Sequence, residues 1–101
     1  MNKISAVIIT KNEVNNIFTC IQSIRWVDEV LIVDSGSTDK TIEICKENGC
    51  RIIQKDWMGF GKTKKFAVDN ANYDLILSID ADEVVSDELH KRVKNILSEP
   101  D

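Results

Sequence analysis

Short runs of β-favouring apolar residues alternate with segments of helical periodicity along the whole chain, and this alternation restricts the fold more than any other feature. The apolar runs that we interpret as strands are 4–9, 29–33, 51–54 and 75–79. Helices are predicted at 14–26, from an N-cap within 37–39 to about residue 48, at about 62–72, and after Ser86. The order βαβαβαβα predicts a parallel sheet covered by helices on both faces.

The expected fold class is therefore α/β, a Rossmann-like doubly wound sheet. Its expected strand order is 3-2-1-4, because right-handed crossovers leave few other topologies. A length of 101 residues corresponds to one domain, and an apolar fraction of 43% suffices for a packed core. The N-terminal apolar run, 6–9, is too short for a signal peptide or a membrane span.

Composition also limits the classes of partner. The formal net charge of −4 argues against a nucleic-acid-binding protein. Cys20, Cys45 and Cys50 are an odd number of cysteines without metal-ligand spacing. We therefore interpret them as reduced thiols of a cytosolic protein.

Polar side chains follow three of the four predicted strands at the point where each strand ends. The segments are TKNE at 10–13, DSGSTD at 34–39 and DADE at 80–83. Open α/β sheets bind ligands beyond the carboxyl ends of their strands. We therefore expect one crevice to collect Thr10, Asn12, Asp34, Asp80 and Asp82.

Converging carboxylates raise one another's pKa unless they share a cation. Oxygen ligands one residue apart, such as Asp80 and Asp82, suit Mg²⁺ or Mn²⁺. Because Mg²⁺ is usually held by one or two carboxylates together with substrate phosphates, the predicted ligand is a phosphate ester with a divalent cation. The alternative is that such residues form turns and cap helices, and this is the interpretation we prefer for Asp39 and Asp87.

Lys62, Lys64 and Lys65 lie at the start of a predicted helix, where cations oppose the helix dipole. A bound anion would explain their position, since helix N-termini bind phosphates. A solvated basic face is the alternative. Packing in the core or at an edge is the preferred interpretation of Trp26 and Trp57.

The segments AVIITKNE, VLIVDSGSTDKT and LILSIDADE together resemble the N-terminal half of family 2 glycosyltransferases of the GT-A fold. The resemblance covers essentially the whole chain, so residues 1–101 are expected to be the nucleotide-sugar-binding part of a GT-A domain. The segment WMGFGKTKKFA is similar to the lipopolysaccharide-core glucosyltransferase branch.

The resemblance implies roles for individual residues. Thr10 and Asn12 would flank the base and ribose of a nucleotide-sugar donor, most often a uridine diphosphate sugar, with Glu13 nearby. Asp34 would contact the nucleoside. Ser35 stands where many members have a second aspartate, and its hydroxyl can still form a hydrogen bond.

The resemblance also assigns the cation site and the diphosphate contacts. Asp80 would meet the ribose or a metal-bound water, and Asp82 would ligate Mg²⁺ or Mn²⁺ on the diphosphate. Lys62 or Lys64 would stabilise the negative charge of the departing nucleoside diphosphate.

The implied reaction is inverting transfer of a sugar to a saccharide or lipid-linked acceptor in cell-envelope glycan synthesis. In this family the general base lies in a C-terminal half that binds the acceptor, and this chain ends one predicted helix after DADE. We therefore expect no catalytic base in it and no activity of these residues alone. The implied location is cytoplasmic, with peripheral association of the full enzyme at the inner face of the cell membrane.

Two other functions are compatible with parts of the sequence. The segment DADEVV also fits the motif of haloacid-dehalogenase-like phosphatases, in which Asp80 would be the nucleophile. That motif usually opens a domain on its first strand, and here three βα units precede it. A non-catalytic nucleotide-binding or receiver-type module is the other alternative, although a receiver needs an acidic pair after the first strand and TKNE offers only Glu13.

Overall fold

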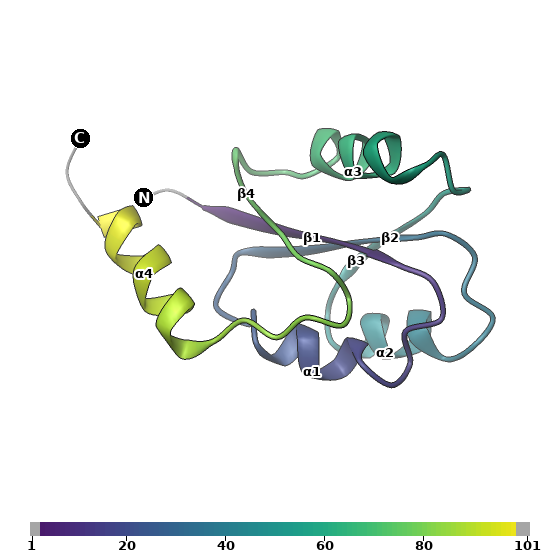
Figure 1. Ribbon diagram of the computed structural model, residues 1–101, viewed down its shortest axis with the longest axis horizontal. Coiled ribbons are helices and arrows are strands. Elements are labelled where there is room, and N and C mark those ends of the chain that lie inside the picture. The colour runs from purple at the N-terminus through teal and green to yellow at the C-terminus, as the bar shows by residue number, and fades with distance from the viewer. Residues whose placement is uncertain (1–2, 99–101) are drawn as a thin grey trace.

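Strands and helices alternate through residues 3–98, which are the residues that the computed structural model describes (Figure 1). The strands are β1 (Ile4–Thr10), β2 (Glu29–Asp34), β3 (Arg51–Gln54) and β4 (Leu75–Ser78). The helices are α1 (Ile17–Gln22), α2 (Thr41–Glu47), α3 (Phe60–Asp69) and α4 (Asp87–Ser98). The predicted βαβαβαβα order is confirmed.

The strands form one parallel sheet in the order β3-β2-β1-β4, as predicted. Thr10 of β1 pairs with Asp34 of β2, and Asp34 pairs with Gln54 of β3. The last residues of these three strands therefore lie side by side at one edge of the sheet. The last residue of β4, Ser78, pairs with Val7 and lies further back along β1.

Helices cover both faces of the sheet, with α1 and α2 on one face and α3 on the other (Figure 1). Successive side chains of a strand point to opposite faces, so the apolar run of β1 supplies both layers of the core. Ala6 and Ile8 are buried with α1 and α2, whereas Val7 is buried with Ala67 of α3. An uninterrupted apolar strand is what a sheet covered on both faces requires.

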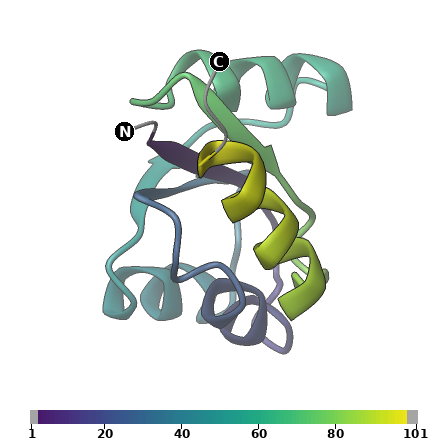
Figure 2. The ribbon, with the colours of Figure 1, turned by 90° about the vertical axis from the view of Figure 1, so that its left-hand side faces the viewer.

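The helix α4 lies at the end of the molecule where β1 begins, as the view in Figure 2 shows. Ser86 caps it as predicted, because its Oγ accepts a hydrogen bond from the amide of Leu89 at 3.1 Å. The ring of His90 stacks on Trp26 with 4.2 Å between the ring centroids. In the part of the chain that the structure describes, no helix has the length and apolar character needed to cross a bilayer.

Three helices differ from their predicted bounds. The helix α2 begins at Thr41 with its N-cap at Lys40, rather than within 37–39. The helix α1 spans Ile17–Gln22 rather than 14–26. A turn precedes it, in which the amides of Asn16 and Ile17 donate to the carbonyl of Glu13, and the amides of Glu13 and Val14 are held by the side chains of Thr41 and Asp39. The helix α3 begins two residues earlier than predicted. Gly59 precedes it with a φ of 94°, a conformation that glycine adopts without steric cost.

Candidate functional site

A buried carboxylate ties the ends of β1 and β2 to the loop that follows β2. The hydroxyls of Thr10 and Ser37 donate to Oδ2 of Asp34 at 2.7 and 2.6 Å. The amides of Gly36 and Ser37 donate to Oδ1 at 3.0 and 2.8 Å. Asp34 is completely buried, and these donors occupy the four acceptor positions that two carboxylate oxygens offer.

The ionised form of Asp34 is the one that this network stabilises. Burial by itself raises the pKa of Asp34, but the hydrogen bonds from Ser37, Thr10 and Gly36 outweigh burial and hold that pKa below its ordinary value. The charge fixes the path of the chain from Ser35 to Ser37. In the structure Asp34 thus positions the loop, and its contact with a nucleoside stays a prediction.

Asn12 joins the loop after β1 to the same segment. Its Oδ1 accepts hydrogen bonds from the amides of Thr38 and Asp39 at 2.7 and 3.3 Å, and its own amide donates to Ser37 Oγ at 2.8 Å. Its φ of 55° belongs to the left-handed region, which asparagine tolerates better than most residues. The carboxylate of Asp39 is also occupied within the protein. The hydroxyl of Thr41 donates to it, and this bond, together with further hydrogen bonds, lowers the pKa of Asp39.

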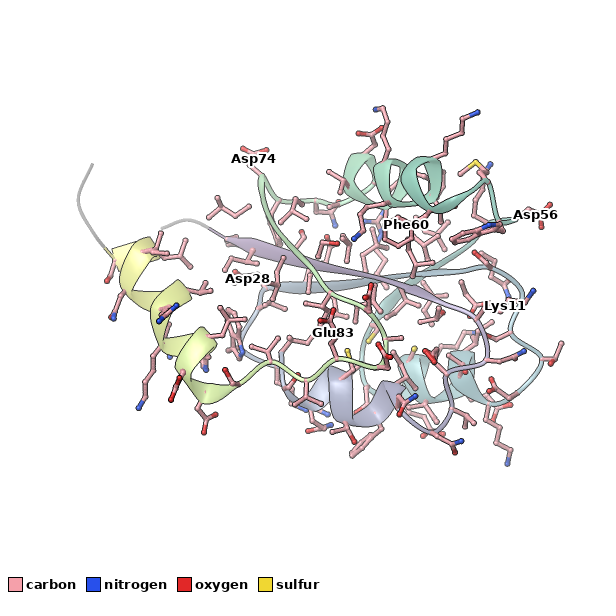
Figure 3. All side chains as sticks on the ribbon, viewed as in Figure 1. Lys11, Asp28, Asp56, Phe60, Asp74 and Glu83 are labelled. Carbon is pink, nitrogen blue, oxygen red and sulfur yellow. The ribbon has the colours of Figure 1, made fainter. Side chains whose placement is uncertain are left out.

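Two cavities lie at the carboxyl ends of β1, β2 and β3. One has a volume of about 430 Å³, and its lining residues are Ile9, Thr10, Lys11, Glu13, Ser35 and Trp57. The other has a volume of about 550 Å³, and its lining residues are Asp34, Gly36, Gln54, Lys55, Asp56 and Met58. Figure 3 shows Lys11 and Asp56 at this end of the sheet.

Cavities therefore lie at the predicted edge of the sheet, but they do not collect the five expected residues. Thr10 and Asp34 line different cavities, and neither cavity is lined by Asn12, Asp80 or Asp82. Three predicted site residues, Thr10, Glu13 and Ser35, line the first cavity. Trp57 also lines it and is 54% exposed, contrary to the expectation that it packs in the core or at an edge. Lys11 and Lys55, which line the two cavities, were not among the predicted site residues.

Ser35 brings an unused polar atom to the first cavity. Its amide donates to the carbonyl of Thr10 at 2.9 Å, which holds the residue against the end of β1. Its Oγ is buried and has no hydrogen-bond partner within residues 3–98. Buried hydroxyls are normally paired, so this atom is a candidate contact for a ligand, and that contact stays a prediction.

The acidic segment after β4 is a turn held against α1. Ile79, Ala81 and Val85 are buried in the core that α1 covers, and this leaves the intervening Asp80 and Asp82 exposed. Glu83 closes the turn, since its Oε1 accepts the amide of Asp80 at 2.7 Å and its own amide donates to the carbonyl of Asp80 at 2.9 Å. Figure 3 shows Glu83 on the α1 side of the sheet.

The carboxylates of Asp80 and Asp82 accept no hydrogen bond and form no ion pair with any residue from 3 to 98. The carboxylate oxygens of Asp34 and Asp39, by contrast, already accept hydrogen bonds from the protein. Burial, with the nearby charges of Glu83 and Asp82, raises the pKa of Cys20 to about 12. The negative charges of the turn therefore act on Cys20, a residue of α1.

A divalent cation fits this donor set only if a ligand completes its shell. Among the described residues, no three His, Cys, Asp or Glu side chains gather closely enough to hold a metal. Mg²⁺ is commonly bound by one or two carboxylates together with substrate phosphates. Two free carboxylates without a protein cage match that mode, and their role as metal ligands stays a prediction.

The predicted lysines lie apart from both cavities. Lys62 is exposed on the first turn of α3, and Lys64 Nζ lies 4.8 Å from the centre of the Phe60 ring. Lys65 pairs instead with Asp69 at 2.7 Å. Neither Lys62 nor Lys64 lines either cavity, so contacts of these two lysines with a diphosphate stay a prediction.

Several proteins with similar sequences are described as glycosyltransferases. A protein of Rickettsia felis described as an uncharacterized glycosyltransferase is 46% identical over 99 residues, which cover 97% of this chain and 35% of the relative. The lipopolysaccharide core biosynthesis glycosyltransferase LpsC of Rhizobium meliloti is 32% identical over 103 residues, covering 97% of this chain and 38% of LpsC. The chain thus spans about a third of the length of these curated relatives.

A solved structure shares the fold. Glucosyl-3-phosphoglycerate synthase from Mycobacterium tuberculosis, in complex with Mn²⁺, uridine diphosphate and phosphoglyceric acid, matches with a TM-score of 0.77 and 27% identity. The match covers 96% of this chain and 39% of the synthase. The family model described as glycosyl transferase family 2 matches residues 5–101. This chain therefore belongs to glycosyl transferase family 2.

Proposed function

We propose that the carboxyl edge of the sheet binds the nucleotide part of a nucleotide-sugar donor, most often a uridine diphosphate sugar. The observation that carries this proposal is that two aspartates have their oxygens occupied by hydrogen bonds and two do not. Asp34 and Asp39 accept hydrogen bonds that build the loops around the cavities, while Asp80 and Asp82 are exposed and their carboxylates have no partner among the described residues. The related synthase whose solved complex contains Mn²⁺ and uridine diphosphate supports the choice of ligand.

The residues around the first cavity would recognise the nucleoside. Glu13 and the free hydroxyl of Ser35 offer hydrogen bonds, and the exposed ring of Trp57 offers an apolar surface. Thr10 would act at the base or ribose from the same cavity. Asn12 would act mainly by holding the loop after β2 in place, because its side-chain oxygen already accepts two amides.

Asp82 and Asp80 would hold Mg²⁺ or Mn²⁺ beside the diphosphate. When bound, the cation supplies Lewis-acid stabilisation of the departing nucleoside diphosphate. Lys62 or Lys64, at the start of α3, would add positive charge next to that leaving group. Asp80 would also reach the ribose.

We propose that the whole protein transfers a sugar, with inversion, to a saccharide or lipid-linked acceptor in cell-envelope glycan synthesis. LpsC, a lipopolysaccharide core glycosyltransferase by its description, supports this class of acceptor. Residues 1–101 would supply the donor-binding part. Since they correspond to about a third of the curated relatives, the general base and the acceptor contacts would come from further residues of the full protein.

A cytoplasmic location at the inner face of the cell membrane completes the proposal. Beside Trp57, two large apolar side chains before and at the start of α3 are exposed: Met58 by 36% and Phe60 by 59%. Lys62 and Lys65 lie on the same helix. Aromatic residues with flanking lysines are typical of surfaces that enter the headgroup region of an anionic membrane.

A thermal-shift panel of nucleoside diphosphates, each with Mn²⁺ or with EDTA, tests the proposed ligand. We expect uridine diphosphate with Mn²⁺ to raise the melting temperature most, and inorganic phosphate with Mn²⁺ to have no effect. Failure of every nucleotide to raise the melting temperature would refute donor binding. Membership of family 2 argues against the phosphatase interpretation of Asp80, and an aspartyl adduct trapped by beryllofluoride would restore it.

A further inference from the structure

Two cysteines meet at the end of α2, outside the proposed donor site. The amide of Gly49 donates to the carbonyl of Lys46 and the amide of Cys50 donates to the carbonyl of Cys45, both at 3.1 Å, and Gly49 has a φ of 76°. These bonds define a Schellman motif, in which the third residue from the helix end and the second residue beyond the C-cap, here Asn48, bring their side chains together. Those two positions are Cys45 and Cys50.

The two thiols differ in their surroundings. Cys45 is completely buried, whereas Cys50 packs against the same core cluster but is partly exposed. Arg25 of α1 reaches the same turn, since its guanidinium donates to Asn48 Oδ1 at 2.7 Å. The hydrogen bond from Cys45 and the charge of Arg25 lower the pKa of Cys50 despite its burial, while the pKa of Cys45 is raised by that hydrogen bond, by burial and by the charge of Asp34.

We propose that Cys45 and Cys50 form a redox-active dithiol that a hydroperoxide oxidises to an intramolecular disulfide. In the first step the Cys50 thiolate attacks the peroxide oxygen, giving a sulfenic acid and releasing hydroxide or alkoxide. In the second step the Cys45 sulfur attacks the Cys50 sulfur. The disulfide forms, the thiol proton and the sulfenic hydroxyl leave as water, and the peroxide is the species reduced.

Geometry favours this pair over the third cysteine. Cys20 lies in the same core layer but is completely buried, and its thiol donates to the carbonyl of Asp80 at 3.6 Å. Its complete burial keeps the Cys20 sulfur away from solvent, where a peroxide or an alkylating reagent would have to reach it. Cys20 therefore serves as an internal control for reactivity within the same protein.

The bond would close a ring of six residues, 45–50, across the end of α2. The Schellman hydrogen bonds already hold the two positions together, so the bond adds a covalent link to an existing contact. The oxidised protein should melt at a higher temperature than the reduced protein, and dithiothreitol should reverse the change.

Peptide mapping tests the proposal directly, because trypsin separates all three cysteines. Cleavage gives TIEICK (41–46), ENGCR (47–51) and NEVNNIFTCIQSIR (12–25). After treatment of the reduced protein with hydrogen peroxide and alkylation, we expect TIEICK joined to ENGCR, with the loss of two hydrogens. The peptide with Cys20 should remain alkylated, and before oxidation Cys50 should alkylate roughly tenfold or more faster than Cys20.

Two variants separate the steps. In Cys45→Ser, the Cys50 sulfenic acid should persist long enough to be trapped by dimedone. In Cys50→Ser, neither Cys45 nor Cys20 should react at the same peroxide concentration. A disulfide that includes Cys20, a disulfide between two molecules, or a wild type in which Cys50 accumulates only as sulfinic acid would overturn the proposal.

Discussion

At the scale of single residues, what separates the aspartates of this protein is whether their oxygens are already in use. Asp34 accepts four hydrogen bonds in a fully buried position, and Asp39 accepts the amide and hydroxyl of Thr41. Asp80 and Asp82 are exposed, and no described residue donates to their carboxylates. Aspartate side chains thus stabilise the loop after β2, whereas those in the turn after β4 are free to bind a ligand.

Asp34→Asn should destabilise the protein. The amide group would face hydrogen-bond donors that now meet a carboxylate oxygen, and an unpaired buried group costs roughly 1–3 kcal/mol. Urea denaturation at pH 7 measures the loss in the free energy of unfolding. Asp74→Asn, an exposed position at the start of the segment leading to β4, is the matched control and should behave as wild type.

The effect of Asp34→Asn on the free energy of unfolding should depend on pH. The folded-state pKa of Asp34 lies below its ordinary value of 3.8, so its contribution is present above the unfolded-state pKa and is lost as the pH falls through the folded-state pKa. The difference in unfolding free energy between wild type and Asp34→Asn should therefore be full above about pH 5 and shrink at lower pH. A difference that is independent of pH would show that the charge of Asp34 is not what stabilises the loop.

Ser35→Ala should separate stability from binding. Because the Ser35 hydroxyl is buried without a partner in the described part of the chain, removing it should leave the free energy of unfolding unchanged or raise it by up to about 1 kcal/mol. Uridine diphosphate should bind more weakly by about 0.5–1.5 kcal/mol, since the hydroxyl would no longer meet the nucleoside. Denaturation and calorimetry on the same samples measure both. Equal losses in stability and binding would assign Ser35 a structural role.

The residues at the strand ends could be predicted because the rule for parallel sheets places them at one edge. Thr10, Glu13 and Ser35 line a cavity there for that reason. The same rule applies to Lys55, which directly follows β3. Trp57 could not be predicted to line a cavity, because its position depends on the path of the chain between β3 and α3. That path is fixed partly by a contact outside the strand pattern, the 3.2 Å hydrogen bond from the amide of Met58 to Thr63 Oγ1.

At the scale of elements, apolar periodicity predicts which segments are strands and helices, and distant contacts decide where they end. The residues before α1 are held by Thr41 and Asp39, which lie 25 to 28 positions away in the sequence. The helix propensity of a segment contains no information about hydrogen-bond partners that lie so far away in the sequence. The cap of α4 at Ser86 is local, with its hydrogen bond three residues away, and it was predicted.

The exposed apolar residues beside α3 should bind anionic membranes. In a Trp26→Phe background, Trp57 is the only tryptophan, and its fluorescence should shift to the blue with phosphatidylglycerol vesicles but not with phosphatidylcholine vesicles. Phe60→Ser should reduce the shift, and salt should weaken it by screening the lysines.

Phe18 provides the matched control for that experiment. It is 51% exposed, close to the 59% of Phe60, but it lies on α1, which covers the opposite face of the sheet. Phe18→Ser should leave vesicle binding unchanged. If Phe18→Ser reduces the shift as much as Phe60→Ser does, the surface at α3 has no specific role.

At the scale of the whole molecule, the parallel sheet explains why one end carries the proposed site. All four strands run in the same direction, so the loops that follow β1, β2 and β3 gather where Thr10, Asp34 and Gln54 stand in register. The opposite end, where Figure 3 shows Asp28 and Asp74, holds the starts of the strands. The functional proposal therefore depends on donor binding at the carboxyl end, with Asp82 as a metal ligand.

Calorimetric titration of uridine diphosphate into wild type and Asp82→Asn, in Mn²⁺ and in EDTA, tests this claim most directly. In Mn²⁺ we expect Asp82→Asn to bind at least roughly tenfold more weakly than wild type, a loss of about 1.4 kcal/mol. In EDTA the two should bind alike, because no cation is then present for the carboxylate to hold. Asp74→Asn, at the far end of the sheet, should match wild type in both conditions. Wild-type affinity of Asp82→Asn in Mn²⁺ would contradict the account and leave the acids after β4 as turn-forming residues.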